Sequence, residues 1–206
     1  MHTVIKPKIL YFGTTVVLIS TLNEDGSPNL APMSSAWWLN ESCMLGLSHK
    51  SQTVQNLIRE RQCVLNLPSP DLIPAIDNLT LLTGRNPVPD SKAERGYMYE
   101  KDKFGVSGLS PLPSHQVRAP RVEQCPVHLE ASVVQLHSFE APSSLTAIEV
   151  RIEKVHVEDS LLMEGKPHHI DPSKWNPMIM NFCQYFGLSE QLSASKLAPV
   201  FGLGSS

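Results

Sequence analysis

The chain has 206 residues, of which 41% are hydrophobic and 18% charged, as is typical of a globular protein long enough to bury a sizeable core. Its formal net charge is −3 and its pI is near 6.2, which excludes a broadly basic surface for nucleic acid or an anionic membrane. No stretch reaches the roughly 18 consecutive apolar residues that a membrane span requires.

The N-terminal stretch places Lys6 and Lys8 before an apolar run and superficially resembles a secretory signal peptide. It lacks a convincing small-residue cleavage site, and Thr14 and Thr15 interrupt the run, so we interpret it as a buried strand. Cytoplasmic localisation is the simplest inference from the scattered cysteines, which form no CxxC pair and argue against a zinc site or a disulfide framework: Cys43, Cys63, Cys125 and Cys183.

The first half of the chain alternates strand and turn signals. Residues 16–21 (VVLIST) are rich in β-formers and end at a turn over 23–26, so residues 27–38 are expected to return as the next strand. Residues 43–47 form a further candidate strand. Val54, Leu57 and Ile58 then fall at helical spacing, which predicts a short helix from about residue 53 to 60.

The middle of the chain, about 70–122, is rich in Pro, Gly and Ser and predicts a loop insertion rather than regular structure. Within it, residues 91–101 have a helical composition that Gly96 weakens. Clean period-two alternation over 127–133 and 148–153 predicts two antiparallel strands with one solvated face, joined across 139–144.

The strand signals, with residues 63–67 before Pro68 as a further strand, predict a mainly β fold: a single domain over 1–206, built as an antiparallel barrel with a few short helices. Met178, Phe182 and Tyr185 fall at helical spacing. We therefore expect a C-terminal helical extension at about 172–198 that packs on the barrel.

A polar segment, Ser48-His49-Lys50-Ser51-Gln52-Thr53, stands where a strand ends and the short helix begins. Unpaired N–H groups and the peptide dipoles make a helix N-terminus a site for an anion, most naturally a phosphate. A single Ser or Thr that caps the helix explains part of the same pattern. The residues alone favour neither interpretation.

In this context the chain resembles the flavin reductase-like family, whose members bind FMN on a split β-barrel. The resemblance covers roughly residues 10–198. It rests on segments in the same order as in the family: 16–21 with the Asp25-Gly26 turn, 29–34, the T-x-x-N-I and V-x-N elements at Thr53, Asn56, Ile58 and Asn66, 125–130, and 155–159.

The resemblance implies a split antiparallel β-barrel, a homodimer, and FMN close to the subunit interface. The segment Ala31–Trp37 is then expected to line the isoalloxazine and ribityl chain, and Ser48–Thr53 to hold the phosphate. The expected cofactor-binding residues are Ala31, Pro32, Met33, Ser34, Ser35, Ala36, Trp37, Ser48, His49, Lys50, Ser51, Gln52, Thr53 and Asn56. Trp37-Trp38 is bulkier than the family pattern at this place, and one indole could stack near the flavin while the other fills the core.

A flavin carries the redox reactivity itself, so the expected activity is hydride transfer from NAD(P)H to flavin, with orientation and hydrogen-bond donors supplied by the protein. No acid–base residue is assigned. The alternatives are a flavin-binding protein that stores or senses flavin, and a barrel that has lost its site. The acceptor (free flavin, a partner monooxygenase or a bound substrate) and the choice of NADH or NADPH stay open.

Other polar groups have weaker signals. His128 and Glu130 share a strand face that is more simply solvated than a proton relay, and His168-His169 lack a third ligand at metal spacing, so no metal is expected. Arg118 and Arg121 could contact the phosphates of a nicotinamide dinucleotide, although isolated loop cations are more often solvated.

Overall fold

The computed structural model describes residues 1–139 and 144–203; most of the expected connection over 139–144 lies outside these ranges. Its main element is a seven-stranded antiparallel sheet in the order β3-β2-β6-β11-β12-β5-β4. These strands are β2 Val17–Leu22, β3 Pro28–Met33, β4 Ala36–Leu39, β5 Ser42–Ser48, β6 Gln62–Leu67, β11 Val127–Phe139 and β12 Leu145–Val157, with helix α1 Gln52–Glu60 between β5 and β6.

The connection between β3 and β4 explains how this sheet curves. The two strands lie at opposite edges of the sheet, yet only Ser34 and Ser35 separate them in the chain. The three Cα–Cα steps from Met33 to Ala36 reach at most about 11 Å, so the sheet must curl until its edges approach one another. The backbone N–H of Gly46 in β5 donates to the carbonyl of Ser35 (2.8 Å). The single strand expected over 27–38 is therefore two strands joined by a corner.

Strand β2 is buried along its whole length because both faces of the sheet are covered there. Val17 and Ile19 point into the barrel core, with Leu45, Leu65 and Ile148. Leu18 packs instead in a second core beneath the segment 70–122. Burial on both faces explains why residues 16–19 (VVLI) are an uninterrupted apolar run in the sequence.

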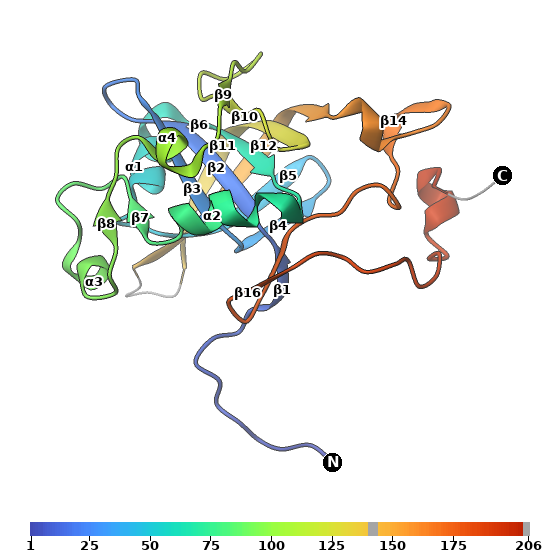
Figure 1. Cartoon of the computed structure of the whole chain (residues 1–206), viewed down its shortest axis with the longest axis horizontal. Coiled ribbons are helices and arrows are strands. Elements are labelled where there is room, and N and C mark those ends of the chain that lie inside the picture. The colour runs from blue at the N-terminus through green and yellow to red at the C-terminus, as the bar shows by residue number, and fades with distance from the viewer. Residues whose placement is uncertain (140–143, 204–206) are drawn as a thin grey trace.

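The segment 70–122 contains short regular elements, of which the helices over 73–79 and 103–107 pack on the outside of β3 and over Leu18 of β2 (Figure 1). The elements are η1 Pro70–Leu72, α2 Ile73–Leu79, β7 Leu82–Thr83, α3 Asp90–Ala93, β8 Met98–Tyr99, α4 Lys103–Ser107, β9 Pro111–Leu112 and β10 Arg121–Val122. Ile76, Leu79 and Phe104 supply the apolar side chains of this second core. The insertion is thus a packed layer despite its many prolines.

The predicted helix over 91–101 is wrong. Helix α3 ends at Ala93, Gly96 has a φ of +83°, and β8 then pairs in parallel with β7. A left-handed residue cannot continue a right-handed helix, so Gly96 turns the chain toward β7.

The predicted C-terminal helix over 172–198 is also wrong. The chain there forms a hairpin of β15 Ile179–Asn181 and β16 Gln184–Phe186, whose turn residues Phe182 and Cys183 both have positive φ. Strand β15 pairs with β1 Phe12–Thr15, and backbone pairing across the chain overrides the local helical spacing. The remaining elements are η2 Asp159–Leu161, β13 Leu162–Met163, β14 Lys166–Ile170 and η3 Ala198–Phe201.

Candidate functional site

Helix α1 begins where the polar segment predicts. Ser51 is its N-cap, and the Ser51 hydroxyl accepts a hydrogen bond from the backbone N–H of Val54 (3.2 Å). No group in residues 1–139 or 144–203 accepts from the amide N–H groups of Gln52 and Thr53, the first two residues of the helix. The segment therefore caps the helix and still leaves donors for an anion, so the two interpretations of the sequence are compatible.

A cavity of about 530 Å³ opens beside this helix N-terminus. This volume lies within the range of small-molecule binding sites. Two groups of residues line it: one from β3, the end of β5, the α1 turn and the start of β12, and one from the insertion. The residues are Ala31, Pro32, Leu47, Ser48, Lys50, Ser51, Gln52, Thr53, Ser144 and Leu145 from the first group, and Leu79, Thr80, Leu82, Thr83, Gly84, Pro89, Ser91, Lys92, Arg95, Tyr97 and Lys103 from the second.

The cavity brings together many of the residues expected to bind a cofactor: Ala31, Pro32, Ser48, Lys50, Ser51, Gln52 and Thr53. Among the expected residues outside its lining, His49 makes a hydrogen bond between its Nδ1 and the Thr146 hydroxyl (3.0 Å). Met33 and Trp38 pack against the barrel core, and Ala36 is buried within it. Ser34 and Ser35 form the corner after β3.

Trp37 is 55% exposed and lines a separate hollow of about 260 Å³ together with Leu39 and Met44. The two tryptophans therefore have different environments. Trp38 belongs to the core and Trp37 to the surface, which the sequence could not assign.

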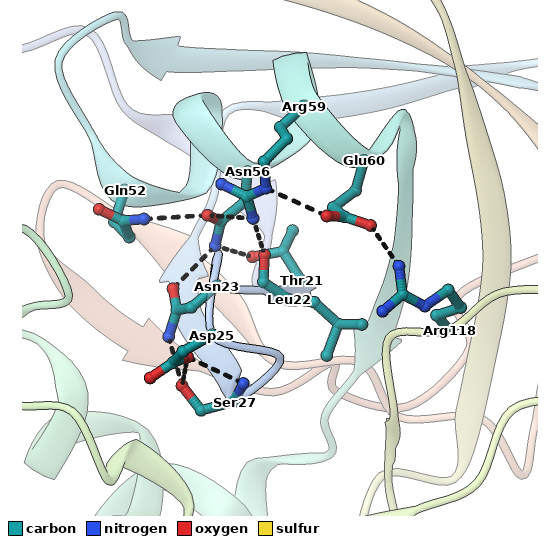
Figure 2. Close-up of polar contacts among 10 residues, drawn as sticks. All are labelled: Thr21, Leu22, Asn23, Asp25, Ser27, Gln52, Asn56, Arg59, Glu60 and Arg118. Carbon is teal, nitrogen blue, oxygen red and sulfur yellow. Dashed lines mark hydrogen bonds and ion pairs between the residues drawn. The ribbon is translucent and has the colours of Figure 1, made fainter.

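Asn56 is fully buried and lies at the centre of a polar network rather than at the cavity (Figure 2). Its amide nitrogen donates to the Thr21 hydroxyl (3.0 Å) and to Asn23 Oδ1 (3.0 Å). Its Oδ1 accepts from Gln52 Nε2 (2.9 Å) and from the Arg59 guanidinium (3.1 Å). The network fixes α1 to the end of β2 and to the turn that follows, and so orients the helix N-terminus that faces the cavity.

The insertion supplies cations that the sequence did not single out: Lys92, Arg95 and Lys103. Their approach depends on Gly84, where a Cβ atom would lie 2.5 Å from Asn29 Oδ1 and 3.2 Å from Gln52 Cγ. Any side chain at this position would push the insertion away from α1. The only sequence signal was the unusual length of the irregular segment, which is typical of functional loops.

The comparisons with known proteins match this chain to one protein family and to a relative over most of its length. The family described as flavin reductase like domain matches residues 9–186. The uncharacterised protein YdfE of Bacillus subtilis is 40% identical over 188 residues, which cover 91% of this chain and 90% of YdfE.

The chain belongs to the flavin reductase like domain family.

Solved structures agree with this membership. Flavoredoxin of Desulfovibrio vulgaris (Miyazaki F) matches with a TM-score of 0.79 at 22% identity, covering 97% of this chain and 100% of flavoredoxin. Nitrilotriacetate monooxygenase component B of Bacillus cereus matches with a TM-score of 0.70 at 16% identity, covering 89% and 88% of the two chains. The split antiparallel barrel with few short helices, predicted from the sequence, is confirmed. No helix in the described ranges is long and apolar enough to cross a membrane.

Within this flavin reductase fold, His128 and Glu130 do not lie on a solvated face, and that prediction is wrong. His128 is 7% exposed and Glu130 is fully buried, because residues 113–122 fold across this part of β11. The Glu130 carboxylate accepts from the backbone N–H groups of His115 (2.9 Å), Gln116 (2.5 Å) and Val117 (3.1 Å). His156 Nε2 adds a contact of 2.6 Å. These hydrogen bonds connect residues 115–117 of the insertion to strand β11 of the barrel.

The loop arginines are held by the protein itself. The Arg118 guanidinium pairs with Glu60 at 2.9 Å, and Arg121 donates to the carbonyl of Pro113 at 2.9 and 3.1 Å. Neither lines the cavity. This arrangement therefore does not support the expectation that they contact a dinucleotide. Lys92 and Lys103 of the insertion line the cavity instead.

Proposed function

We propose that the protein binds FMN in this cavity and transfers a hydride from NAD(P)H to the flavin. The observation that carries the proposal is the convergence of Lys50, the Ser51 and Thr53 hydroxyls and the unpaired amides of α1 on one cavity wall. This donor set fits a phosphomonoester, which carries close to two negative charges at neutral pH.

The interactions available are strong enough for a cofactor. Micromolar binding requires about 8 kcal/mol. Each hydrogen bond to a charged phosphate contributes roughly 1.5–3 kcal/mol, so three of them supply much of that amount. Ala31 and Pro32 add apolar surface next to the turn, along the strand that leads to Ser34 and Ser35. The hydroxyls and backbone N–H groups of these serines are candidate donors for the ring.

The bound flavin supplies the redox chemistry, as an acceptor of hydride from a nicotinamide. The residues of the chain then bind and orient it: Lys50 and the α1 turn anchor the phosphate, and the β3 segment positions the ring. No side chain needs to exchange a proton in this proposal. Reduced flavin would pass to a second acceptor, and a partner monooxygenase is one candidate, in view of the component B structure described above. A cytoplasmic site of action accords with the unpaired cysteines, three of them buried.

A homodimer is part of the proposal. Strand β4 is an edge of the sheet, and its Trp37 and Leu39 are 55% and 65% exposed. An exposed apolar edge strand of this kind is typical of an interface, and a second copy of the chain would bury it. The same contact would enclose the β3–β4 corner. Light scattering is expected to give twice the chain mass of 22.8 kDa; a monomer at micromolar concentration would contradict the dimer.

The change Lys50→Ala tests the FMN assignment, because Lys50 is exposed at the cavity and its loss should leave the fold intact. We expect FMN affinity to fall about tenfold or more in fluorescence titration. Riboflavin has no phosphate, so its affinity should stay within about twofold. The matched control is Lys196→Ala, an exposed lysine outside the cavity lining.

Equal losses for FMN and riboflavin, or no loss for FMN, would contradict a phosphate site at the α1 turn. Consumption of NAD(P)H in the presence of FMN then distinguishes the two flavin functions. Steady oxidation that depends on added flavin is expected for a reductase. Tight flavin binding without oxidation would leave a storage or sensing protein.

A further inference from the structure

The cavity has more positive charge than one flavin phosphate requires. Lys50 and the α1 N-terminus already provide a cation and a helix dipole for that phosphate. Lys92, Arg95 and Lys103 add a second group of cations from the insertion, which we call the insertion cluster. No Asp or Glu belongs to the described lining, and Glu100, outside it, offsets only part of the effects that lower the pKa of Lys103.

Lys103 is the most unusual member of the insertion cluster. It is only 4% exposed, and no acceptor within the described ranges takes a hydrogen bond from its ammonium. Burial, together with the nearby charge of Lys92, lowers the pKa of Lys103 to about 8. A largely buried lysine whose ammonium meets the cavity without an acceptor is costly, and such a group is typical of a site that a ligand completes.

Lys92 lies close enough to lower the pKa of Lys103. Burial first, and then Arg95, lowers the pKa of Lys92. The Lys92 ammonium lies 3.4 Å from the Thr83 hydroxyl and 5.0 Å from the centre of the Tyr97 ring. The cluster is therefore an array of mutually repelling cations, and an anion among them would relieve the repulsion.

We propose that the insertion cluster is a second phosphate subsite, which acts together with the α1 turn on ligands that carry more than one phosphate group. The inference rests on the proposed flavin function. Two ligands of that function carry a phosphate beyond those of their nearest analogue: a flavin dinucleotide, through its second phosphate, and a nicotinamide dinucleotide that bears a 2′-phosphate. The subsite would then set the preference for FAD over FMN, or for NADPH over NADH.

The test compares ligand pairs that differ by one phosphate group. Titrations of the flavin-free protein with FAD and FMN form the first pair. Titrations of the FMN-loaded protein with NADP⁺ and NAD⁺ form the second, and these oxidised forms bind without turnover. We expect at least one pair to differ about tenfold or more in affinity.

The variant Lys103→Met keeps the length and apolar stem of the side chain but removes its charge. We expect it to abolish most of this preference while FMN affinity changes less than about threefold. The matched control is Lys101→Met, two residues away on the same segment and outside the cavity lining. Its exposed ion pair with Asp25 contributes little, so the preference should persist.

The proposal is overturned if neither pair discriminates in the unaltered protein. It is also overturned if Lys103→Met weakens FMN binding as strongly as Lys50→Ala, since the cluster would then serve the same phosphate as the α1 turn. If the protein binds no flavin, the proposed function fails separately. The NADP⁺ and NAD⁺ titrations on the flavin-free protein then decide the subsite.

Discussion

Replacement of Glu130 by alanine is expected to lower the free energy of unfolding by about 3–5 kcal/mol. The carboxylate is fully buried and accepts from the backbone N–H groups of residues 115–117, with His156 as a further partner. Removing it leaves these donors buried without an acceptor, which costs more than the hydrogen bonds themselves contribute. Denaturant unfolding measures the change, with Glu24→Ala, an exposed carboxylate, as the control.

The same carboxylate should make stability depend on pH. Burial opposes its charge, but the backbone N–H groups and His156 outweigh that effect and lower the pKa of Glu130 to about 2. A lowered folded-state pKa means that the stabilisation is complete above the unfolded-state value of about 4.3 and is lost as the pH falls from there toward 2. His115 and Arg121 also face this region. Burial lowers the pKa of His128 and of His156, so these two histidines reduce stability as the pH falls below the unfolded-state value of about 6.5.

The isosteric change Glu130→Gln separates these contributions. It should be less destabilising than alanine, because one carbonyl oxygen remains to accept. The unaltered protein should lose more stability than this variant between pH 4.3 and 2. Parallel acid unfolding curves for the two proteins would contradict the role assigned to Glu130.

The change Asn56→Ala is expected to lower the free energy of unfolding by about 2–4 kcal/mol. Asn56 makes four hydrogen bonds in the buried network of Figure 2, and its removal leaves Thr21, Asn23 and Arg59 each short of a partner. Gln55→Ala, at the neighbouring position of α1, loses only an exposed contact to the His49 carbonyl and serves as the control.

Flavin titration of the folded Asn56→Ala protein tests the alternative that Asn56 contacts the cofactor. Since Asn56 does not line the cavity, FMN and riboflavin affinities should weaken together and only modestly, through a looser α1. A stable variant with a large loss confined to FMN would place Asn56 at the phosphate instead.

The elements that the sequence predicted correctly have strong local determinants. Apolar spacing and a capping serine determine α1, and alternation or β-branched runs determine β2, β6 and the β11–β12 pair. The incorrect helices over 91–101 and 172–198 had only weak spacing signals, and β8 and β15 formed there because partner strands were available. Local propensity amounts to less than the gain from pairing a strand.

The residues of the candidate site likewise fall into a group with local sequence signals and a group without them. Sequence by itself determined the α1 turn, because a cap, unpaired amides and a lysine within six residues are local facts of the chain. Only the tertiary structure placed Lys92, Arg95 and Lys103 in the same cavity lining as the α1 turn, and buried Glu130 beneath residues 113–122. Charge and burial at such positions depend on contacts between segments that are distant in sequence. The close packing of Gly84 against Asn29 brings the insertion to α1, and no periodic pattern in the sequence predicts that contact.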